Sequence, residues 1–506
     1  MTAPSGDYDL LVVGGGINGT GIARDAAGRG LSVLLCEQHD LASHTSSAST
    51  KLIHGGLRYL EHFEFRLVRK ALAEREVLLA AAPHIIWPLR FVLPHEPHLR
   101  PAWMIRAGLL LYDHLARRRR LGPSRAIDLR THPAGEPLSH RDRRGFEYSD
   151  GWVDDARLVA LNALDAHERG ARILTRTHCS RIMRERGGWT ATLHDHAGAR
   201  LVVRARAVVN AAGPWVGRFL DQATPIRARR AVRLVKGSHI IVPRLFAHEF
   251  AYIFQNRDRR IIFAIPYQHA FTLIGTTDVE FHADPERVAI DADETAYLCA
   301  LASHYFAQHV TPADVVASYA GVRPLLEDES ADPSSVTRDY SFELDADGPP
   351  LLSVFGGKIT TYRRLAEDAL ASLLPALGSS VGPWTRSVPL PGGDMPGGDY
   401  AAFRTAVAQR YPAMPAELLD RWSRAYGTRI GAMLGAARSP AELGEEVLPS
   451  LYATEIAYLR QHEWAHSAAD ILWRRSKLGL HLPAGAAAEL DAWLARHAPG
   501  YQEPRG

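Results

Sequence analysis

A short apolar run followed at once by regularly spaced glycines constrains the fold more than any other feature of this chain. Residues 10–13 (LLVV) have the composition of a buried parallel strand, and Gly14, Gly16 and Gly19 follow in a G-x-G-x-x-G spacing. The first glycine permits a tight turn, the second lets backbone N–H groups approach a pyrophosphate, and the third lets the next helix pack closely on the strand. Because the N-terminus of that helix carries partial positive charge, residues 10–30 predict a strand, an anion-binding turn and a helix.

The next predicted strand places an acidic residue where a dinucleotide site needs one. Residues 31–35 form another apolar run, and Glu37 follows it. An acid at this distance from the glycine turn accepts hydrogen bonds from ribose hydroxyls. A glycine-rich surface loop is the alternative, because in a chain with 41 glycines the spacing can arise by chance. We favour the dinucleotide site, although these residues do not decide between NAD and FAD.

Length, composition and cysteine use exclude several classes of protein. The 506 residues suffice for two or three domains, and 46% hydrophobic with 23% charged residues is ordinary for a globular protein. Cys36, Cys179 and Cys299 form no C-x-x-C pair, which argues against a disulfide framework, a zinc site or a redox dithiol, and we predict no metal site. The polar start predicts no secretory signal, and we find no apolar window long enough for a spanning helix.

A run of small hydroxylated residues leads from the predicted ribose-binding strand to a cluster of basic side chains. Residues 43–58 (SHTSSASTKLIHGGLR) contain Lys51, His54 and Arg58. Such runs are usually loops or helix caps, but here the chain leaves the ribose-binding strand and can pass back over a cofactor. His54 and Arg58 are spaced by one helical turn with a glycine pair between them, so we expect a kinked segment close to the ligand.

The following region combines a scaffold helix with a segment of unusual composition. Residues 61–82 predict an amphipathic helix, and residues 102–120 read AWMIRAGLLLYDHLARRRR. A short, tryptophan-containing segment that ends in arginines is typical of a helix lying in a membrane interface. One alternative is a buried helix followed by a solvated arginine run. The other is nucleic-acid binding, which is poorly supported because no stacking aromatic residues alternate with the four arginines.

The middle of the chain returns to alternating strands and helices and favours FAD over NAD. Residues 154–169 predict a helix that begins near Asp154 or Asp155, followed by strands at residues 173–177, 190–193 and 201–203 and a further strand at 207–209. That strand runs into residues 210–215 (NAAGPW). A small-residue turn with Gly213 lets a second stretch of backbone approach the cofactor, as flavoproteins with two dinucleotide folds require.

The second half of the chain predicts an antiparallel sheet, another glycine turn and a helical end. Strand-like runs occupy residues 239–242, 251–254, 261–265 and 271–278, a natural wall for a substrate pocket. Residues 294–309 predict a helix, and residues 315–325 a strand ending near Arg323. In residues 351–362 a glycine pair and Lys358 precede a helix, which indicates an anion or ring-edge site unless Lys358 is merely a solvated turn residue. Beyond residue 383 a Pro- and Gly-rich linker leads to a separate helical domain with no chemistry of its own.

Taken in order, several of these motifs resemble the FAD-dependent, respiratory (aerobic) glycerol-3-phosphate dehydrogenase family. The resemblance runs from Leu10 through the C-terminal helices and includes HGGLRY, GSHIIVP, IGTTDVE, GVRPL, GGKITTY and DILWRRSKLGL. It implies a mixed α/β fold with a Rossmann-like FAD-binding domain of the D-amino-acid-oxidase type, an antiparallel-sheet substrate domain and a C-terminal helical domain. The expected boundaries are residues 1–75, 151–225 and 318–384 for the FAD-binding domain, 76–150 and 226–317 for the substrate-binding and membrane-facing domain, and 385–506 for the C-terminal helical cap.

The same resemblance implies a reaction, partners and a location. The family oxidises sn-glycerol 3-phosphate to dihydroxyacetone phosphate with FAD and passes electrons to a membrane quinone. We therefore expect a cytoplasmic protein attached peripherally to the inner face of the cell membrane, with no nucleic-acid partner, and leave open whether it forms a homodimer.

Site residues follow from the matching motifs. The resemblance implies that the substrate and flavin are lined by His54, Arg58, Arg323 and Lys358, with Tyr59 and Arg338 in matching positions and His239 in the same pocket. The cofactor is expected to contact Gly14, Gly16, Ile17, Asn18, Gly19, Glu37, Ser46, Ser47, Ser49, Lys51, Leu52, His54, Ala211, Gly213, Gly357, Lys358, Ile359 and Thr360.

The chemistry of these side chains agrees with that reaction. Arginine forks hold a phosphate dianion best, so Arg323 with Arg338 or Arg58 is expected to bind the phosphate. A histidine can remove the C2 hydroxyl proton near neutral pH, so His54 or His239 is the candidate base. Lys358 near the pyrimidine edge would stabilise negative charge on the reduced ring. The rivals are a glycerol-3-phosphate oxidase that uses oxygen, an amino-acid oxidase of the same fold, and a flavin-containing RNA-associated scaffold.

Overall fold

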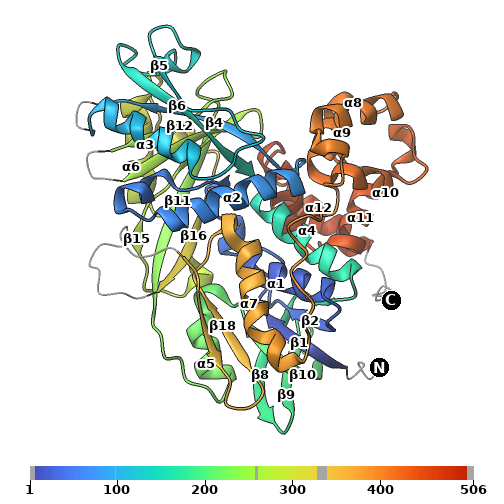
Figure 1. Cartoon of the computed structure of the whole chain (residues 1–506). Helices are drawn as coiled ribbons and strands as arrows, with labels where there is room; N and C mark the ends of the chain where they lie inside the picture. The colour runs from blue at the N-terminus through green and yellow to red at the C-terminus, as the bar shows by residue number, and fades with distance from the viewer. Residues whose placement is uncertain (1–5, 97–98, 257–259, 327–338, 498–506) are drawn as a thin grey trace.

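The computed structural model describes residues 6–96, 99–256, 260–326 and 339–497, and the side chains of residues 58, 61 and 62 lie outside the described part. Figure 1 shows one sheet with its helices in the lower part of the view, a second sheet above it, and the C-terminal helices packed at the side. The mixed α/β fold with a helical C-terminal domain is as predicted.

The first sheet is built around the N-terminal strand and carries the predicted glycine turn. Its strand order is β17-β18-β10-β1-β2-β7, with β8 and β9 continuing from β10. β1 pairs in parallel with β2 and β10, as a doubly wound sheet requires. The bounds are β1(Asp7–Val13), β2(Val33–Cys36), β7(Arg172–Leu174), β8(Thr177–Glu185), β9(Gly188–Asp195), β10(Arg200–Asn210), β17(Ser341–Asp345) and β18(Leu351–Phe355).

Helices cover the first sheet and bury the glycine-turn helix. α1(Ile17–Gly28) packs between α4(Asp155–Glu168) and α7(Tyr362–Leu377), and most of its side chains are buried. α5(Val216–Ala223) packs on β8 and β18. α4 begins where predicted, since the Asp154 carboxylate accepts a hydrogen bond from the Arg157 N–H as an N-cap. The strand, turn and helix predicted for residues 10–30 are confirmed.

One prediction for this sheet was wrong. Residues 201–203 and 207–209 are not separate strands but parts of the continuous strand β10. Its first half pairs antiparallel with β9 and its second half pairs parallel with β1. Exposed arginines alternate with buried residues in the first half, whereas the last residues are buried on both faces. This change of environment within one strand breaks the apolar pattern that sequence reading follows.

The second sheet is mainly antiparallel, as predicted for residues 232–277. Its order is β15-β11-β14-β13-β12-β4-β6-β3, with β16 paired to β11 and β5 paired to β6. β12 and β4 form a parallel pair within it. The bounds are β3(Leu52–Ile53), β4(Ile86–Pro94), β5(Arg125–Asp128), β6(Arg144–Val153), β11(Val232–Pro243), β12(Ala251–Gln255), β13(Ile261–Tyr267), β14(Phe271–Gly275), β15(Val279–Glu280) and β16(Ala317–Leu326). Because β16 belongs to this sheet, the expected boundary at residue 318 does not coincide with a change of sheet; the domain limits stay a prediction.

Three helices accompany the second sheet: α2(Phe65–Ala81), α3(Ala102–His114) and α6(Ala292–Tyr305). α2 starts later than predicted because residues 57–62 form the 3-10 helix η2(Leu57–His62), which ends at Phe63 with a φ of 58°. α3 occupies the unusual segment and leaves Trp103 69% and Leu110 50% exposed. Within the described residues, no helix has the length and apolar character needed to cross a membrane.

The arginine run after α3 is tied to neighbouring segments rather than simply solvated. Arg118 forms an ion pair with Asp113 at 2.6 Å. Arg120 donates hydrogen bonds to the carbonyl oxygens of Gly397 and Gly398 in the linker to the C-terminal domain. Three of the four arginines, Arg117, Arg119 and Arg120, are nevertheless exposed, as expected for a solvated run, whereas α3 has an exposed apolar face and is not a buried helix.

The C-terminal domain has its own core of helices, as predicted. It contains α8(Tyr400–Arg410), α9(Ala416–Tyr426), α10(Ile430–Leu434), α11(Ala453–Glu463), the π-helical turn η11(Asp470–Arg475) and α12(Ala486–Arg496), with the small strands β19(Glu446–Leu448) and β20(Leu451–Tyr452). The apolar face of α9 formed by Leu418, Leu419, Trp422 and Tyr426 is buried, whereas Trp473 on η11 remains 39% exposed. α11 and η11 pack against α4 of the first domain.

Candidate functional site

The turn between β1 and α1 brings three stretches of backbone into close contact. Gly14 has a φ of +114°, and a Cβ atom there would lie 2.4 Å from the carbonyl oxygen of Ala211. A Cβ on Gly19 would lie 1.9 Å from the Gly14 carbonyl oxygen. Both glycines are therefore required by space, which fits the roles predicted for the turn and for helix packing. At the start of α1 the Ile17 N–H donates to Ser46 Oγ at 3.0 Å.

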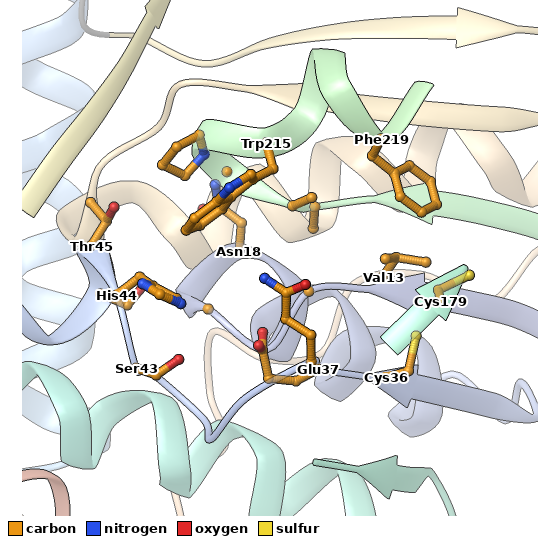
Figure 2. Close-up of a pocket in the computed structure, with 18 of the residues that line it drawn as sticks. Val13, Asn18, Cys36, Glu37, Ser43, His44, Thr45, Cys179, Trp215 and Phe219 are labelled. Carbon is orange, nitrogen blue, oxygen red and sulfur yellow. The ribbon is translucent and has the colours of Figure 1, made fainter. Parts of the chain in front are cut away.

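A cavity of about 380 Å³ opens beside this turn. We call it the glycine-turn cavity. Its walls come from the turn itself, residues 36–38 and 42–46, residues 177–180, the segment around Trp215, and the glycine pair before Lys358. Figure 2 shows Glu37, His44, Asn18 and Trp215 surrounding the space, with Cys36, Cys179 and Phe219 at one end. Its size is in the range of cofactor sites.

Glu37 stands at the end of β2 on the wall of the glycine-turn cavity, as predicted. Its carboxylate accepts hydrogen bonds from the Gly15 N–H at 2.7 Å and the His39 N–H at 2.8 Å. Burial raises the pKa of Glu37 above its usual value. The hydrogen bond from the Gly15 N–H fixes the Glu37 carboxylate against the glycine turn, beside the position expected for a ribose.

Aromatic and imidazole rings form another part of the wall. The His44 ring meets Trp215 edge-on, with ring centroids 4.7 Å apart, and its Nε2 lies 3.0 Å from His39 Nδ1. Burial and the neighbouring His39 lower the pKa of His44 to about 4. His44 is therefore neutral at pH 7. The sequence motif that contains it gave no reason to single it out, because its ring reaches the cavity only through the loop conformation.

Cys36 and Cys179 are distant in the sequence but line the same end of the cavity. A side-chain hydrogen bond with Cys179 and burial raise the pKa of the Cys36 thiol well above its usual value. Sequence spacing argued against a dithiol; the strands β2 and β8 nevertheless bring these two thiols together.

The cofactor residues predicted from sequence divide into two groups. Those that line the glycine-turn cavity are Gly14, Gly16, Ile17, Asn18, Glu37, Ser46, Ala211, Gly213 and Gly357. Those outside its lining are Gly19, Ser47, Ser49, Lys51, Leu52, His54, Lys358, Ile359 and Thr360. Among these, Lys51 forms a buried ion pair with Asp155 at 2.7 Å, and Leu52 is buried in the core of the second domain. Contacts of the second group with a cofactor stay a prediction.

The HGGLRY and GGKITTY motifs meet beside the cavity. The His54 N–H donates to Thr360 Oγ1 at 3.2 Å, and Lys358 Nζ lies 3.8 Å from the centroid of the Tyr59 ring. Gly56 adopts a φ of 75°, which gives the kink expected between His54 and Arg58. The side chain of Arg58 lies outside the described part, and Arg338 lies outside the described residues.

His239 lies on β11 in a buried position next to β16. Its ring stacks on Tyr319 with centroids 4.7 Å apart, and Nε2 lies 3.0 Å from Thr50 Oγ1. Among the described residues, Nδ1 has no hydrogen-bond partner. Burial, and then the positive charges of Arg323 and Lys51, lower the pKa of His239 well below its usual value. The imidazole is therefore neutral at pH 7, and its surroundings make it a weaker base than a histidine in water.

Arg323 is oriented by two residues that sequence reasoning did not assign. Its guanidinium forms an ion pair with Asp278 and donates from Nη2 to Thr276 Oγ1 at 3.1 Å. Both partners belong to the IGTTDVE segment, where an acid three residues beyond the end of β14 was the available signal. Pro324 and Gly357, the chain neighbours of Arg323 and Lys358, line the glycine-turn cavity, whereas the two cations themselves do not.

Comparisons with known proteins agree with this geometry. Residues 9–363 match the family described as FAD dependent oxidoreductase, and residues 383–497 match the C-terminal domain of alpha-glycerophosphate oxidase. The chain is 57% identical over 495 residues to the glycerol-3-phosphate dehydrogenase of Pseudomonas aeruginosa, covering 97% of this chain and 96% of that one. It is 50% identical to the aerobic glycerol-3-phosphate dehydrogenase of Escherichia coli, covering 97% of each. The chain belongs to the FAD-dependent glycerol-3-phosphate dehydrogenase family.

Two further comparisons bear on cofactor and substrate. A solved glycerol-3-phosphate dehydrogenase from Bacillus halodurans, complexed with FAD, has a TM-score of 0.79 at 26% identity and covers 97% of this chain and 90% of its own. A D-erythritol 1-phosphate dehydrogenase from Brucella abortus is 51% identical, covering 96% of this chain and 97% of its own. As a member of this family the chain is a flavoprotein oxidoreductase with FAD as its cofactor.

The residues of the glycine-turn cavity fit FAD. Two buried polar atoms of its wall, Asn18 Oδ1 and Ser43 Oγ, have no hydrogen-bond partner among the described residues. Buried polar atoms in proteins are normally satisfied, so these atoms point to a polar ligand. Asn18 Nδ2 donates to the Gly356 carbonyl oxygen at 3.1 Å and thereby joins the two glycine turns that flank the cavity.

Proposed function

We propose that this protein oxidises sn-glycerol 3-phosphate to dihydroxyacetone phosphate and passes the electrons to a membrane quinone. The observation that supports the proposal is that Pro324 and Gly357, the chain neighbours of the cations Arg323 and Lys358, line the glycine-turn cavity, and that the buried imidazole of His239 feels the charge of Arg323. A phosphorylated alcohol needs a cationic site for its phosphate and a base for its hydroxyl proton. The named function of the Pseudomonas and Escherichia relatives supports the same substrate.

The proposed roles follow from the contacts of each side chain. Arg323 binds the substrate phosphate, and the ion pair with Asp278 holds the guanidinium in place. Arg58 or Arg338 supplies a second cation. His239 or His54 removes the hydroxyl proton. Lys358, supported by the Tyr59 ring, provides positive charge beside the flavin. When bound, FAD supplies the two-electron oxidation.

D-Erythritol 1-phosphate is the second candidate substrate. This chain is 51% identical to the D-erythritol 1-phosphate dehydrogenase of Brucella and 50% identical to the glycerol-3-phosphate dehydrogenase of Escherichia. Both substrates are phosphate monoesters of polyols, so the same cationic site can bind either. The value of 57% for the Pseudomonas relative favours glycerol 3-phosphate.

Anaerobic reduction of the bound flavin tests the substrate. We expect glycerol 3-phosphate to bleach the flavin absorbance at least tenfold more efficiently, as kcat/KM, than D-erythritol 1-phosphate. Arg323→Gln should raise the KM for the substrate about a hundredfold and leave the flavin content normal, because the phosphate loses a charged hydrogen-bond donor. Arg364→Gln, on the exposed side of α7, is the matched control. A flavin that neither polyol phosphate bleaches would overturn the proposal.

Quinone rather than oxygen is proposed as the acceptor because α3 presents an apolar face. Trp103, Leu110 and Leu111 are exposed on it, and exposed Phe63 and Phe65 follow η2, which packs on α3. Such a face suits a protein that meets a membrane from the cytoplasmic side. A Mycoplasma pneumoniae glycerophosphate oxidase shares the fold with a TM-score of 0.58 at 17% identity, which leaves an oxygen-using enzyme as the rival.

Parallel assays of quinone reduction and peroxide release decide between these acceptors. We expect a soluble quinone to reoxidise the reduced enzyme at least a hundredfold faster than air-saturated buffer does. Stoichiometric hydrogen peroxide formation at full turnover would assign the oxidase reaction instead. A homodimer stays a prediction, which sedimentation of the holoenzyme can check.

A further inference from the structure

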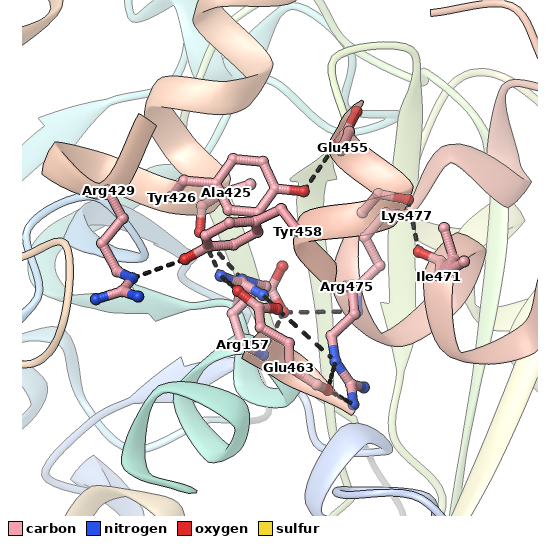
Figure 3. A network of polar contacts seen from close by, with 12 residues as sticks. Arg157, Ala425, Tyr426, Arg429, Glu455, Tyr458, Glu463, Ile471, Arg475 and Lys477 are labelled. Atoms are coloured by element: carbon pink, nitrogen blue, oxygen red, sulfur yellow. Dashed lines mark hydrogen bonds and ion pairs between the residues drawn. The ribbon is translucent and has the colours of Figure 1, made fainter. Parts of the chain in front are cut away.

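The C-terminal domain contacts segments that line the glycine-turn cavity through one short element, η11. Among the described residues that line the glycine-turn cavity, none follows Gly357, so the domain does not form its wall. Yet η11 inserts Arg474 and Arg475 against the first domain, and Arg475 is fully buried there. Figure 3 shows Arg475 beside Glu463 and Arg157, which comes from α4.

The first contact of η11 is with the segment that follows Glu37. Both terminal nitrogens of Arg475 donate to the Asp40 carboxylate, each at 2.8 Å. Arg474 Nε donates to the same carboxylate at 2.6 Å. Asp40 itself does not line the cavity, whereas Glu37, Gln38, Ala42, Ser43, His44, Thr45 and Ser46 do. The contacts of Asp40 with η11 thus hold residues 37–46 in place from the side away from the cavity. We call this segment the first wall.

The second contact of η11 is with the residue before the opposite wall. Asp470 accepts from Arg176 Nη2 at 2.5 Å, and Thr177, His178, Cys179 and Ser180 line the cavity directly after Arg176. Although burial favours the neutral acid, Arg176 and Arg474 lower the pKa of Asp470, so the pair is charged at pH 7. The two walls are also joined to each other, since the Arg176 N–H donates to the His39 carbonyl oxygen at 2.7 Å and the Thr177 N–H to that of Glu37 at 2.8 Å.

From these contacts we infer that η11 is a positioning element for FAD: Arg474 and Arg475, through Asp40, and Asp470, through Arg176, hold the two walls of the cavity at the separation that the cofactor requires. Bidentate guanidinium–carboxylate pairs fix direction as well as distance, which suits this role. If the walls relax, only a fraction of molecules is competent to bind, and the apparent affinity for FAD falls by that fraction. The C-terminal domain then governs cofactor retention without touching the cofactor.

General docking of the domain is a separate matter, and the structure offers a pair that tests it. Arg157 on α4 contacts Glu463 and also donates to the Ala425 carbonyl oxygen at 2.7 Å, so it joins the two domains without contacting either wall. Arg421 pairs with Glu455 at 2.6 Å entirely within the C-terminal domain. Arg157→Gln therefore weakens docking, and Arg421→Gln weakens the domain alone.

The experiment compares flavin release from holoenzyme variants. After dilution of each holoenzyme, the appearance of free-flavin fluorescence gives the dissociation rate, and titration of the stripped protein with FAD gives the dissociation constant. We expect Arg475→Gln to raise the dissociation constant at least tenfold, Arg475→Lys to raise it less, and Arg157→Gln and Arg421→Gln to stay within twofold of the parent while still lowering the melting temperature.

The outcomes separate a positioning role from a structural one. Unchanged FAD affinity in folded Arg475→Gln would overturn the inference, and so would an equal loss of affinity in Arg157→Gln, since docking alone would then explain it. If Arg475→Gln does not fold, Arg474→Gln serves instead, because Arg474 is partly exposed and shares the Asp40 contact. Because the readout is flavin affinity, it is independent of the substrate and acceptor proposed above.

Discussion

At the scale of single residues, Gly14 in the glycine turn and Gly30 after α1 show what an added methyl group would do to the backbone. Gly14 and Gly30 both have a positive φ, +114° and +81°, which is unfavourable for any other residue type. Around Gly14 the Ala211 carbonyl oxygen fills the space where a Cβ would stand, whereas nothing lies within 4 Å of such an atom at Gly30. The two positions therefore separate backbone strain from loss of the close approach that shapes the cavity.

We predict that Gly14→Ala yields protein with less than a tenth of the parent's FAD content. The added Cβ must push residues 211–212 away from the turn and so deform the cavity. Gly30→Ala, the matched control, should keep its flavin and lose about 1–2 kcal/mol of stability from the positive φ alone. Flavin absorbance per protein and thermal unfolding measure both effects. Normal FAD content in Gly14→Ala would show that the contact with Ala211 is not needed.

At the scale of elements, α3 combines a buried and an exposed apolar face. Leu109 and Tyr112 are buried, and the Tyr112 hydroxyl accepts from the Gly55 N–H at 2.8 Å next to His54. Trp103 and Leu110 point to solvent on the other side. The sequence pattern showed the apolar content of this helix but not which side would be covered, because the covering strands and η2 are distant along the chain.

We predict that Trp103→Ser combined with Leu110→Ser weakens binding to anionic liposomes roughly tenfold, since each exposed side chain contributes apolar area to the interface. Reduction of a soluble dye by glycerol 3-phosphate should stay unchanged. Val381→Ser removes an exposed apolar residue elsewhere and should leave flotation unaffected. Equal flotation of the double variant and the parent would remove α3 as the membrane contact.

At the scale of the whole molecule, His84 lies where the linker and the C-terminal domain meet the end of α2. A Cβ on Gly392 would lie 3.1 Å from its Nε2, and one on Gly427 3.0 Å from its Cγ. Within the described part of the chain, neither ring nitrogen has a hydrogen-bond partner. Burial and the charges of Arg157 and Arg424 lower the pKa of His84 to about 3. The junction of the domains therefore contains a neutral imidazole.

This arrangement predicts acid sensitivity. In the unfolded chain His84 takes up a proton near pH 6.5, whereas in the folded protein the pKa of about 3 prevents this, so stability falls as the pH drops below 6.5. At pH 5 the loss from this residue is about 2 kcal/mol. His84→Leu should flatten the decline in melting temperature between pH 7 and pH 5, while His140→Gln, at an exposed site, should not. Parallel declines in both variants would contradict the prediction.

Local patterns were enough to predict the elements that organise the fold. The apolar run and glycine spacing of residues 10–30 determine a strand, turn and helix because each feature acts over a few neighbouring residues. The same holds for Glu37 at the end of β2, the antiparallel strands after residue 232, and the helical C-terminal domain. Strand β10 was misjudged because its two halves face different neighbours, which no local pattern records.

What only the tertiary structure decided is the choice of partner for each charge. The sequence shows that Lys51, Arg323 and Arg475 are basic, but not that Asp155, Asp278 and Asp40 neutralise them. Asp40 and Arg475 are 435 residues apart in the chain, and their pairing requires both domains to be folded and docked. Propensity and periodicity are short-range properties, whereas ion pairing and cavity shape depend on distances in space. The sequence by itself therefore determined the elements and the cofactor class, and the fold determined which side chains are held, which remain available, and what holds the cavity open.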